Sequence, residues 1–242
     1  MVPPRYQYRS DILRSPVRLL LSVFRSWRNL GDSYELKLAE LAIAHSRLGR
    51  RFARWHDVVE TLRADARTAP RLAARRTSGP IDLDALRRLP SGSLGRTLAD
   101  QCLANGLNPN LVQLVPKTDE DWVLAEFYQT HDIWHAVTGW QSDPVGEMGI
   151  AAFYVAQLRA PRWLALLVFL FFLKAVLFAP HTFDGRARAM ATGYRMGQQA
   201  LPLFGIDWSE LWALPIDEVR KRLNVVPSEI QAETSSLLGP LR

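Results

Sequence analysis

The sequence predicts an all-α fold, a single-domain bundle of several helices. Apolar residues recur three and four positions apart along most of the 242 residues, which is the period of a helix with one buried face. Residues that cap helices stand before these runs, and Gly or Pro stands after them. No run alternates apolar and polar residues between hairpin turns, as the strands of an antiparallel sheet would. Hydrophobic residues make up 48% of the chain, which is enough to form a core.

Residues 1–80 are predicted to form a basic helical region that faces a polyanion. Residues 1–88 hold 18 Lys and Arg against 9 Asp and Glu, whereas the remaining residues hold 12 against 15. Because no zinc-finger spacing or RNA-binding aromatic signature accompanies this charge, it favours an anionic membrane surface over nucleic acid.

A helix that begins at Pro16 would be amphipathic. Its arginines lie on the face opposite the apolar residues Val17, Leu20, Leu21, Phe24 and Trp27. Such a helix suits a membrane interface, and an ordinary surface helix packed on the core explains the pattern equally well. The chain starts without the apolar stretch and small-residue site of a signal peptide, so no cleavable signal is expected.

A second helix of this region is predicted over residues 32–49. Asp32 and Glu35 fit a capping box at its start, and Gly49 can close it. The following stretch, 50–76, is rich in arginine. Thr77-Ser78-Gly79-Pro80 then marks a break before the helical core.

The core is predicted to include a helix over residues 93–105 that Gly106 ends. Cys102, the one cysteine of the chain, is interpreted as a small buried apolar residue. A single cysteine excludes an internal disulfide framework and predicts a reducing compartment.

The next helix carries the most informative stretch of the chain, His131-Asp132-Ile133-Trp134-His135. The helix is expected to run from Thr118, with Asp121 as its capping-box partner, to Gly139. Asp143-Pro144 then opens another helix as N-cap and first helical residue. A hairpin of two helices joined by so short a loop brings Glu147 back toward His135.

These side chains form a candidate metal site. At about 100° per residue, Asp132 lies about 100° and His135 about 40° around the helix from His131, so the three can converge on one point that Glu147 completes. Imidazole and carboxylate ligands suit Zn²⁺ first, and also Co²⁺, Mn²⁺ or Fe²⁺. Such a cation could polarise a substrate carboxylate or phenolate.

The alternative is a chance pair of histidines and a capping carboxylate, with no metal. The zincin motif is excluded because Asp132 stands where that motif requires Glu. The HD-type phosphohydrolase pattern needs further His and Asp ligands, and only His181 follows the pair downstream. His45, His56 and His181 are assigned to ordinary surface or core positions.

Residues 163–180 are apolar except for Lys174. As a helix they would span roughly 27 Å, at the short limit for a membrane crossing. Two structures explain the run equally well: a buried helix that lines an apolar cavity, and a helix that dips into a membrane while Lys174 reaches the headgroups. A single helix that crosses the whole membrane is the third interpretation.

The pattern HDxxHx11E from His131 to Glu147 resembles the signature of the coenzyme Q biosynthesis protein 4 family. The flanks FYQTHDIWHAVTG and PVGEMGIAAFYVAQ agree with it. So do DLDALRRLPSGSLGRTLADQCLANGLNPN upstream, and GYRMGQQALPLFGIDW with PIDEVRKRLNV downstream. The similarity covers residues 81–226, taken as the core, and leaves 227–242 as a C-terminal tail.

The resemblance implies an all-α, peripherally membrane-bound protein of ubiquinone synthesis. That family is linked to oxidative removal of the carboxyl group at carbon 1 of a polyprenylated hydroxybenzoate ring, with hydroxylation there. Carried over by position, the metal ligands and catalytic residues would be His131, Asp132, His135 and Glu147. An apolar cavity formed with residues 163–180 would shelter the polyprenyl tail, or the tail of another prenyl lipid.

Further expectations concern partners and location. The resemblance implies contacts with other quinone-synthesis enzymes, and we expect a homo-oligomer at the cytoplasmic face of a bacterial inner membrane. The competing function is a non-catalytic prenyl-lipid scaffold that organises those enzymes around a structural metal. A third function is hydrolysis of lipid phosphates, in which arginines would bind the phosphate; the alternative for them is an ordinary surface position. These arginines are Arg186, Arg188 and Arg195.

Overall fold

The structure is a computed structural model that describes residues 55–159 and 162–227. Throughout these residues the regular secondary structure is helical, which confirms the all-α prediction, and one isolated bridge joins Ser93 to Pro215. The α-helices are α4 (Trp55–Ala64), α5 (Ala69–Ala73), α6 (Leu83–Arg87), α7 (Leu94–Ala104), α8 (Asp119–Thr138), α9 (Pro144–Gln157), α10 (Arg162–Phe178), α11 (Phe183–Gln199) and α12 (Ile216–Leu223). Two 3₁₀ turns, Pro180–Thr182 and Trp208–Glu210, complete them. The helices expected from Pro16 and over 32–49, and most of the 227–242 tail, lie outside the described residues.

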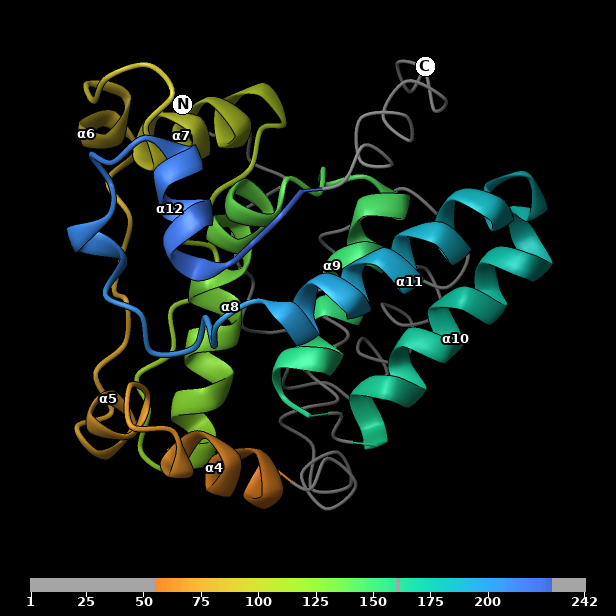
Figure 1. Cartoon of the computed structure of the whole chain (residues 1–242), viewed down its shortest axis with the longest axis horizontal. Helices are drawn as coiled ribbons and strands as arrows, with labels where there is room; N and C mark the ends of the chain where they lie inside the picture. The colour runs from red at the N-terminus through yellow and green to blue at the C-terminus, as the bar shows by residue number, and fades with distance from the viewer. Residues whose placement is uncertain (1–54, 160–161, 228–242) are drawn as a thin grey trace, which may run out of the picture.

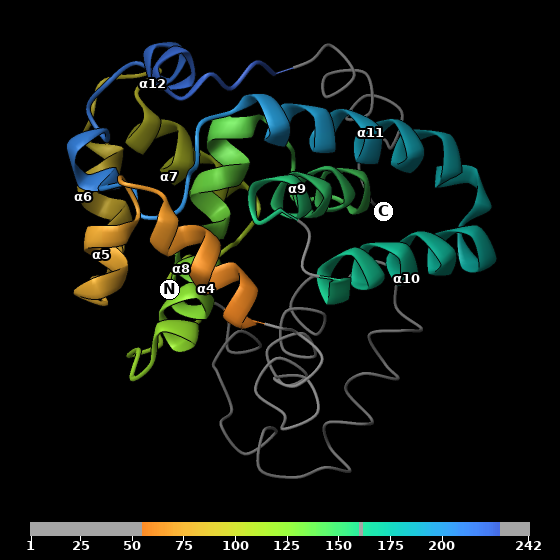
Figure 2. The ribbon, with the colours of Figure 1, turned by 60° about the horizontal axis from the view of Figure 1, so that its bottom comes forward.

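Helix α8 lies between two groups of helices, α5 to α7 and α12 on one side and α9 to α11 on the other, and α4 lies across its N-terminal end (Figures 1 and 2). Four tryptophans are almost wholly buried in the core, at Trp122, Trp134, Trp140 and Trp208. Cys102 is buried among apolar neighbours with 1% of its surface exposed, as predicted.

The helix ends follow the capping residues predicted from the sequence. At the start of α8 the Asp121 amide donates to Thr118 Oγ1 at 3.1 Å, and Asp121 Oδ2 accepts from the Thr118 amide at 3.1 Å. Gly139 ends this helix with a left-handed φ of 82°, a conformation that favours glycine. Asp143 caps α9 by accepting from the amides of Val145 and Gly146. The predicted helix over 93–105 is α7, capped by Ser93.

Helices α9 and α11 cross with their backbones in contact. A Cβ built on Gly193 would lie 2.0 Å from the carbonyl oxygen of Gly149, and one on Gly197 would lie 2.7 Å from that of Phe153. Because any larger side chain would separate the helices, these glycines fix how α9 lies on α11.

Several described arginines of the basic stretch are paired with carboxylates of the core, whereas Arg67 pairs locally with Asp65. Arg63 and Arg75 both contact Asp119 at the start of α8, at 2.7 and 2.9 Å. Although partial burial opposes it, the hydrogen bonds from these two arginines hold the pKa of Asp119 below its usual value. Arg71 likewise contacts Asp207 at 2.9 Å. Part of the basic surplus therefore joins α4 and α5 to the core.

The predicted break at 77–80 is bound to α8 through a buried carboxyl group. Glu126 is fully buried, and its Oε1 accepts from the Ser78 amide at 2.7 Å. Burial raises the pKa of Glu126 to about 7, against the opposing effect of the Ser78 hydrogen bonds and the Arg71 charge. This segment is therefore packed on the helix that carries the motif.

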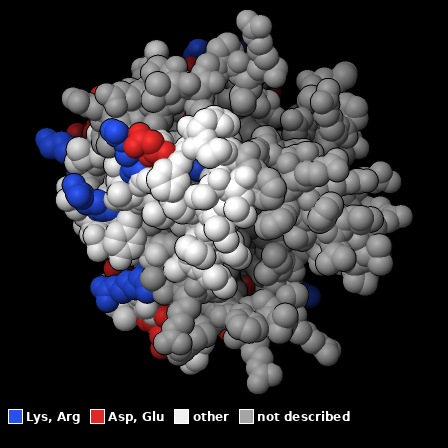
Figure 3. Space-filling view, turned by 90° about the vertical axis from the view of Figure 1, so that its right-hand side faces the viewer, with Lys and Arg blue, Asp and Glu red and all other residues white. Residues whose placement is uncertain are grey.

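Helix α10 lies at the edge of the ribbon in Figure 1, and its described side chains include both buried and exposed ones. Its buried side includes Val168 and Ala175, but the exposed residues on its other side show that the run is not a fully buried helix. An exposed apolar stripe follows its other side, made of Leu166, Phe169, Leu170, Leu173, Val176 and Leu177. Figure 3 views this side of the molecule, where uncharged residues predominate among the described atoms. No described helix is long and apolar enough to cross a bilayer. The apolar cavity expected beside this run stays a prediction.

Candidate metal centre

Three of the four predicted ligands meet between α8 and α9. His131 and His135 extend from α8 and Glu147 from the first turn of α9, and one ligand atom of each lies within 4.8 Å of the others. His131 Nε2 is 3.6 Å from Glu147 Oε2, and His135 Nε2 is 3.5 Å from Glu147 Oε1. Both imidazoles are buried, whereas the Glu147 side chain keeps 25% of its surface exposed. Solvent can therefore reach the cluster on the side of Glu147, whereas the side of the two histidines is buried.

The turn between the two helices sets the direction of Glu147. A Cβ on Gly146 would lie 1.9 Å from the carbonyl oxygen of Gln141, so the chain can fold back this tightly only with glycine at that position. The Asp143 cap then starts α9 at Pro144, which leaves Glu147 facing α8. This hairpin is the one predicted from the sequence.

The His135 ring is oriented for ligation through Nε2. Its Nδ1 lies 2.8 Å from the carbonyl oxygen of Trp140, which assigns the proton to Nδ1 and the lone pair to Nε2. Nε2 is buried without a hydrogen-bond partner and faces Glu147. Burial alone would lower the pKa of His135, but its attraction to the Glu147 carboxylate, the Asp132 charge and the hydrogen bond to Trp140 raise it above its usual value.

The donor set fits a divalent cation. Ligands at about 2.0–2.1 Å around a tetrahedral ion lie about 3.4 Å from one another, close to the 3.5 and 3.6 Å that separate the two Nε2 atoms from the Glu147 oxygens. The buried Nε2 of His135, which has no hydrogen-bond partner, is the kind of atom that a bound ion satisfies. A site of two histidines and one carboxylate leaves further positions for water or substrate.

Asp132 is placed differently from the other three. Its Oδ1 lies 3.6 Å from His131 Nδ1, the ring nitrogen other than the one that approaches Glu147. A carboxylate at the second nitrogen of a ligating histidine fixes the ring and raises its basicity. The ligand group in the structure contains His131, His135 and Glu147 without Asp132, so its geometry suits orientation of His131, and direct ligation by Asp132 stays a prediction.

An aromatic wall that the sequence reasoning missed borders the centre. Trp134 stacks on Tyr154, with ring centroids 4.3 Å apart, and Tyr154 packs on Phe127 at 4.2 Å. Phe127 in turn lies edge-on to His131 at 6.3 Å. The available signal was helical spacing, since Phe127, His131 and Trp134 follow one another by four and three residues.

The three arginines proposed for phosphate binding lie outside this cluster. Arg186 is buried, with 7% of its surface exposed, and its Nε donates to Thr182 Oγ1 at 2.9 Å. The surface assignment is therefore wrong for Arg186. It holds for Arg188, which pairs with Asp184, and for Arg195, because both are exposed.

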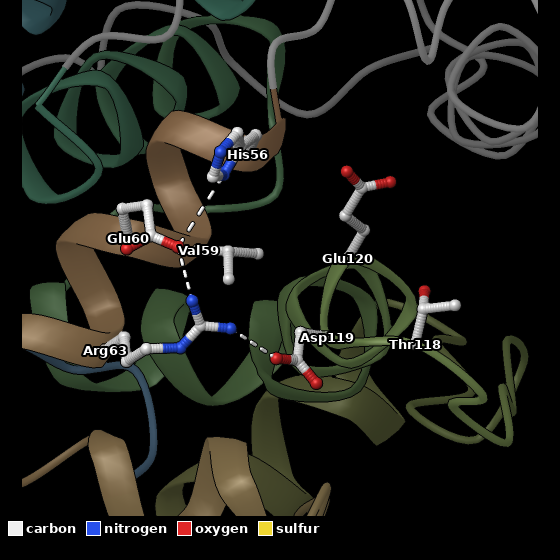
Figure 4. A pocket seen from close by; sticks show the side chains of 7 residues that line it. All are labelled: His56, Val59, Glu60, Arg63, Thr118, Asp119 and Glu120. Atoms are coloured by element: carbon white, nitrogen blue, oxygen red, sulfur yellow. Dashed lines mark hydrogen bonds and ion pairs between the residues drawn. The ribbon is translucent and has the colours of Figure 1, made fainter.

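The other histidines are also outside the centre. His56 and His181 are exposed, as predicted, and His45 lies outside the described residues. Figure 4 shows His56 in a separate, open pocket between α4 and the start of α8, where Glu60 bridges it to Arg63. The described residues that line this pocket do not form a group of three or more possible metal ligands.

Comparison with known proteins identifies the family. The family model "Coenzyme Q (ubiquinone) biosynthesis protein Coq4" matches residues 60–229. The chain belongs to the Coq4 family. This confirms the resemblance drawn from the sequence.

Curated relatives of the Coq4 family resemble the chain over its helical core. The mitochondrial ubiquinone biosynthesis protein coq4 of Aspergillus fumigatus is 30% identical over 159 residues, which cover 62% of this chain and 53% of the relative. The mitochondrial COQ4 of Yarrowia lipolytica is 28% identical over 164 residues, with 62% and 58% covered. The chain thus spans about half the length of the curated relatives it matches.

A solved structure of similar fold exists. A crystal structure titled as a putative ubiquinone biosynthesis protein from Nostoc punctiforme superposes with a TM-score of 0.70 at 24% identity, covering 90% of this chain and 99% of the other. At this identity the likeness supports the fold alone.

Proposed function

We propose that this Coq4-family chain acts in ubiquinone biosynthesis, at oxidative removal of the carboxyl group from carbon 1 of a polyprenylated hydroxybenzoate ring, with hydroxylation there. The observation that carries the proposal is the convergence of both histidine Nε2 atoms and the Glu147 carboxylate on one point. The oxidant would come from outside the chain.

The residues of the centre have separate roles in this proposal. His131, His135 and Glu147 would hold a divalent cation, Zn²⁺ first by its ligand preference and otherwise Co²⁺, Mn²⁺ or Fe²⁺. When bound, the cation supplies Lewis acidity toward the carboxylate and phenolic oxygens of the ring. Asp132 orients His131, or serves as a fourth ligand, and the Trp140 carbonyl oxygen keeps the lone pair of His135 Nε2 directed at the site. Phe127, which is partly exposed, would give the ring an aromatic surface beside His131, with the buried Tyr154 packed against it.

The competing proposal is a scaffold that binds a prenyl lipid and organises other quinone-synthesis enzymes without catalysis. The observation in its favour is the exposed apolar stripe of α10, which offers a surface to a lipid rather than to water. In that case the metal would stabilise the α8–α9 hairpin.

Profiling of quinone intermediates separates the two proposals. A deletion strain is expected to accumulate a prenylated ring that retains its carboxyl group, and the wild-type chain should restore quinone. His135→Ala should leave the ring intermediate accumulated although the protein is present at normal level, because the substitution removes a ligand. Quinone restored by a folded, metal-free His135→Ala chain would contradict the catalytic proposal and favour the scaffold.

We further propose a peripheral location at a membrane, the cytoplasmic face of the inner membrane if the cell is bacterial, with α10 at the lipid surface. Between Glu147 and Asp184 the sequence has no acidic residue, and Arg159, Arg162 and Lys174 lie in that interval. A stretch of sequence that combines an apolar helix with cations and no acidic residue suits an anionic interface.

Sedimentation with phosphatidylglycerol-containing vesicles tests the role of α10. Phe169→Glu is expected to lower the bound fraction several-fold, because a charge would replace a ring that is 57% exposed on the stripe. Val115→Glu, at an exposed apolar residue outside α10, is the matched control and should bind as the wild type does. Equal binding of both variants would assign attachment to basic residues elsewhere. Binding of the wild type that is abolished when the salt concentration is raised would do the same, because salt screens electrostatic attraction.

A further inference from the structure

We propose that Arg220 of α12 is a positioning residue for the metal centre and that it acts by holding the C-terminal end of α8 around His135. The inference rests on the proposed metal centre. It concerns a residue 85 positions beyond His135 in the chain.

The end of α8 depends on Arg220 for its hydrogen bonds. The last four carbonyl groups of an α-helix have no partner within the helix. In α8, the carbonyl oxygen of His135 accepts from the Gly139 amide at 2.9 Å. The next two accept from one side chain: Arg220 Nη2 donates to Ala136 O at 3.2 Å, and Arg220 Nε donates to Val137 O at 2.9 Å. A cation at this end also interacts favourably with the helix dipole.

Arg220 is itself held in place from two directions. The chain before α12 is bonded to the start of α7, because the Leu94 amide donates to Leu214 O and the Ile216 amide donates to Gly92 O, both at 2.9 Å. The end of α12 is bonded to the end of α11, where Asn224 Nδ2 donates to Gln199 O at 2.7 Å. Helix α12 therefore joins the ends of three helices.

The path from Arg220 to the centre is short. His135 lies in the last turn of α8, and its Nδ1 is fixed by the carbonyl oxygen of Trp140, just past the left-handed Gly139. If this turn frays, both the His135 backbone and the carbonyl that orients its ring are displaced. Loss of the Trp140 contact, which orients the His135 ring directly, would typically cost about 10–100-fold in metal affinity.

The bond pattern requires arginine rather than any cation. Nε and one Nη of a guanidinium lie on the same edge and can donate to two neighbouring oxygens together, whereas an ammonium group is a single point. The Asp217 contact of Arg220 adds little, since the Asp217 side chain is 90% exposed. The two carbonyl groups of α8 are thus the main partners of the guanidinium.

Titration of the full-length chain with Co²⁺ tests the inference, with the absorption spectrum reporting ligand geometry. Arg220→Met is expected to bind Co²⁺ about 10–100-fold more weakly and with an altered spectrum, and Arg220→Lys should lie between Met and wild type. Arg222→Met is the matched control on the same helix, because Arg222 is 54% exposed and pairs only locally with Glu218. Circular dichroism should show the same helix content in all four chains.

Hydrogen exchange at the amides of residues 136–140 gives a second readout that needs no metal. Exchange there should be faster in Arg220→Met than in Arg222→Met, while that of α9 stays unchanged. Wild-type Co²⁺ affinity and spectrum in a folded Arg220→Met chain would overturn the inference, as would unchanged exchange. If Arg220→Met does not fold, the same comparison is made with Arg220→Lys. A wild-type chain that binds no Co²⁺ would contradict the proposed function, and hydrogen exchange would still decide whether Arg220 holds the end of α8.

Discussion

Glu147→Gln is expected to lower the affinity of the chain for Zn²⁺ or Co²⁺ by more than about 100-fold while leaving the helices folded. Glu147 faces both histidine Nε2 atoms, at 3.5 and 3.6 Å, and is the one anionic member of the three-residue cluster. An amide of the same shape keeps the packing but removes the charge that a divalent cation requires. Loss of a direct ligand exceeds the effect of about 10–100-fold that outer contacts produce.

Isothermal titration of the metal-depleted chain measures this affinity, with Glu120→Gln as control because Glu120 is exposed at the opposite end of α8. The affinity of the wild type should also fall as the pH is lowered through the raised pKa of His135, since a protonated imidazole cannot bind the ion. Equal affinities for wild type and Glu147→Gln would show that this cluster is not the metal site.

Local sequence signals predicted the helices that carry the centre. Thr118 with Asp121, Gly139, and Asp143 before Pro144 each determine a helix end through bonds within a few residues, so the sequence shows them directly. The approach of Glu147 to His135 could be predicted from those helix ends, because so short a loop makes the second helix run back along the first.

Features that depend on distant residues were not accessible in this way. Asp132 is next to His131 in sequence, but which ring nitrogen its carboxylate meets depends on the rotamers that the packed core allows. Arg220 shows no motif, because its partners are backbone carbonyls more than eighty positions earlier. The exposure of α10 was also undetermined, since an apolar run looks the same whether protein or another apolar surface covers it.

For the basic N-terminal region, too, the composition of the sequence did not reveal contacts between residues that are far apart in the chain. Its surplus of arginine predicted a surface for a polyanion, yet Arg63 and Arg75 meet Asp119, and Arg71 meets Asp207. Charge counts do not reveal which charges fold back on acidic residues far along the chain. The prediction for residues 1–54 is unaffected by this, because it lies outside the described part of the chain.

Gly193→Ala is expected to destabilise the fold by about 2 kcal/mol and to weaken the metal centre with it. The new Cβ would lie 2.0 Å from the Gly149 carbonyl oxygen, a backbone atom that cannot rotate away, so α9 and α11 must separate. Overpacking of this kind costs about 1–3 kcal/mol and at times more, against a gain of about 1 kcal/mol for alanine over glycine in a helix. Because α9 also carries Glu147, its displacement changes the distance from that carboxylate to the histidines.

Urea unfolding of Gly193→Ala, with Gly197→Ala and Ala191→Gly beside it, measures this cost. Gly197→Ala should be milder, since its Cβ would lie 2.7 Å from the nearest backbone oxygen. Ala191 is exposed on the same helix, so Ala191→Gly should cost only about 1 kcal/mol through helix propensity. Co²⁺ affinity should fall in Gly193→Ala and stay unchanged in Ala191→Gly. A Gly193→Ala chain as stable as the wild type would show that α9 and α11 do not meet this closely, and the position of Glu147 would then need another explanation.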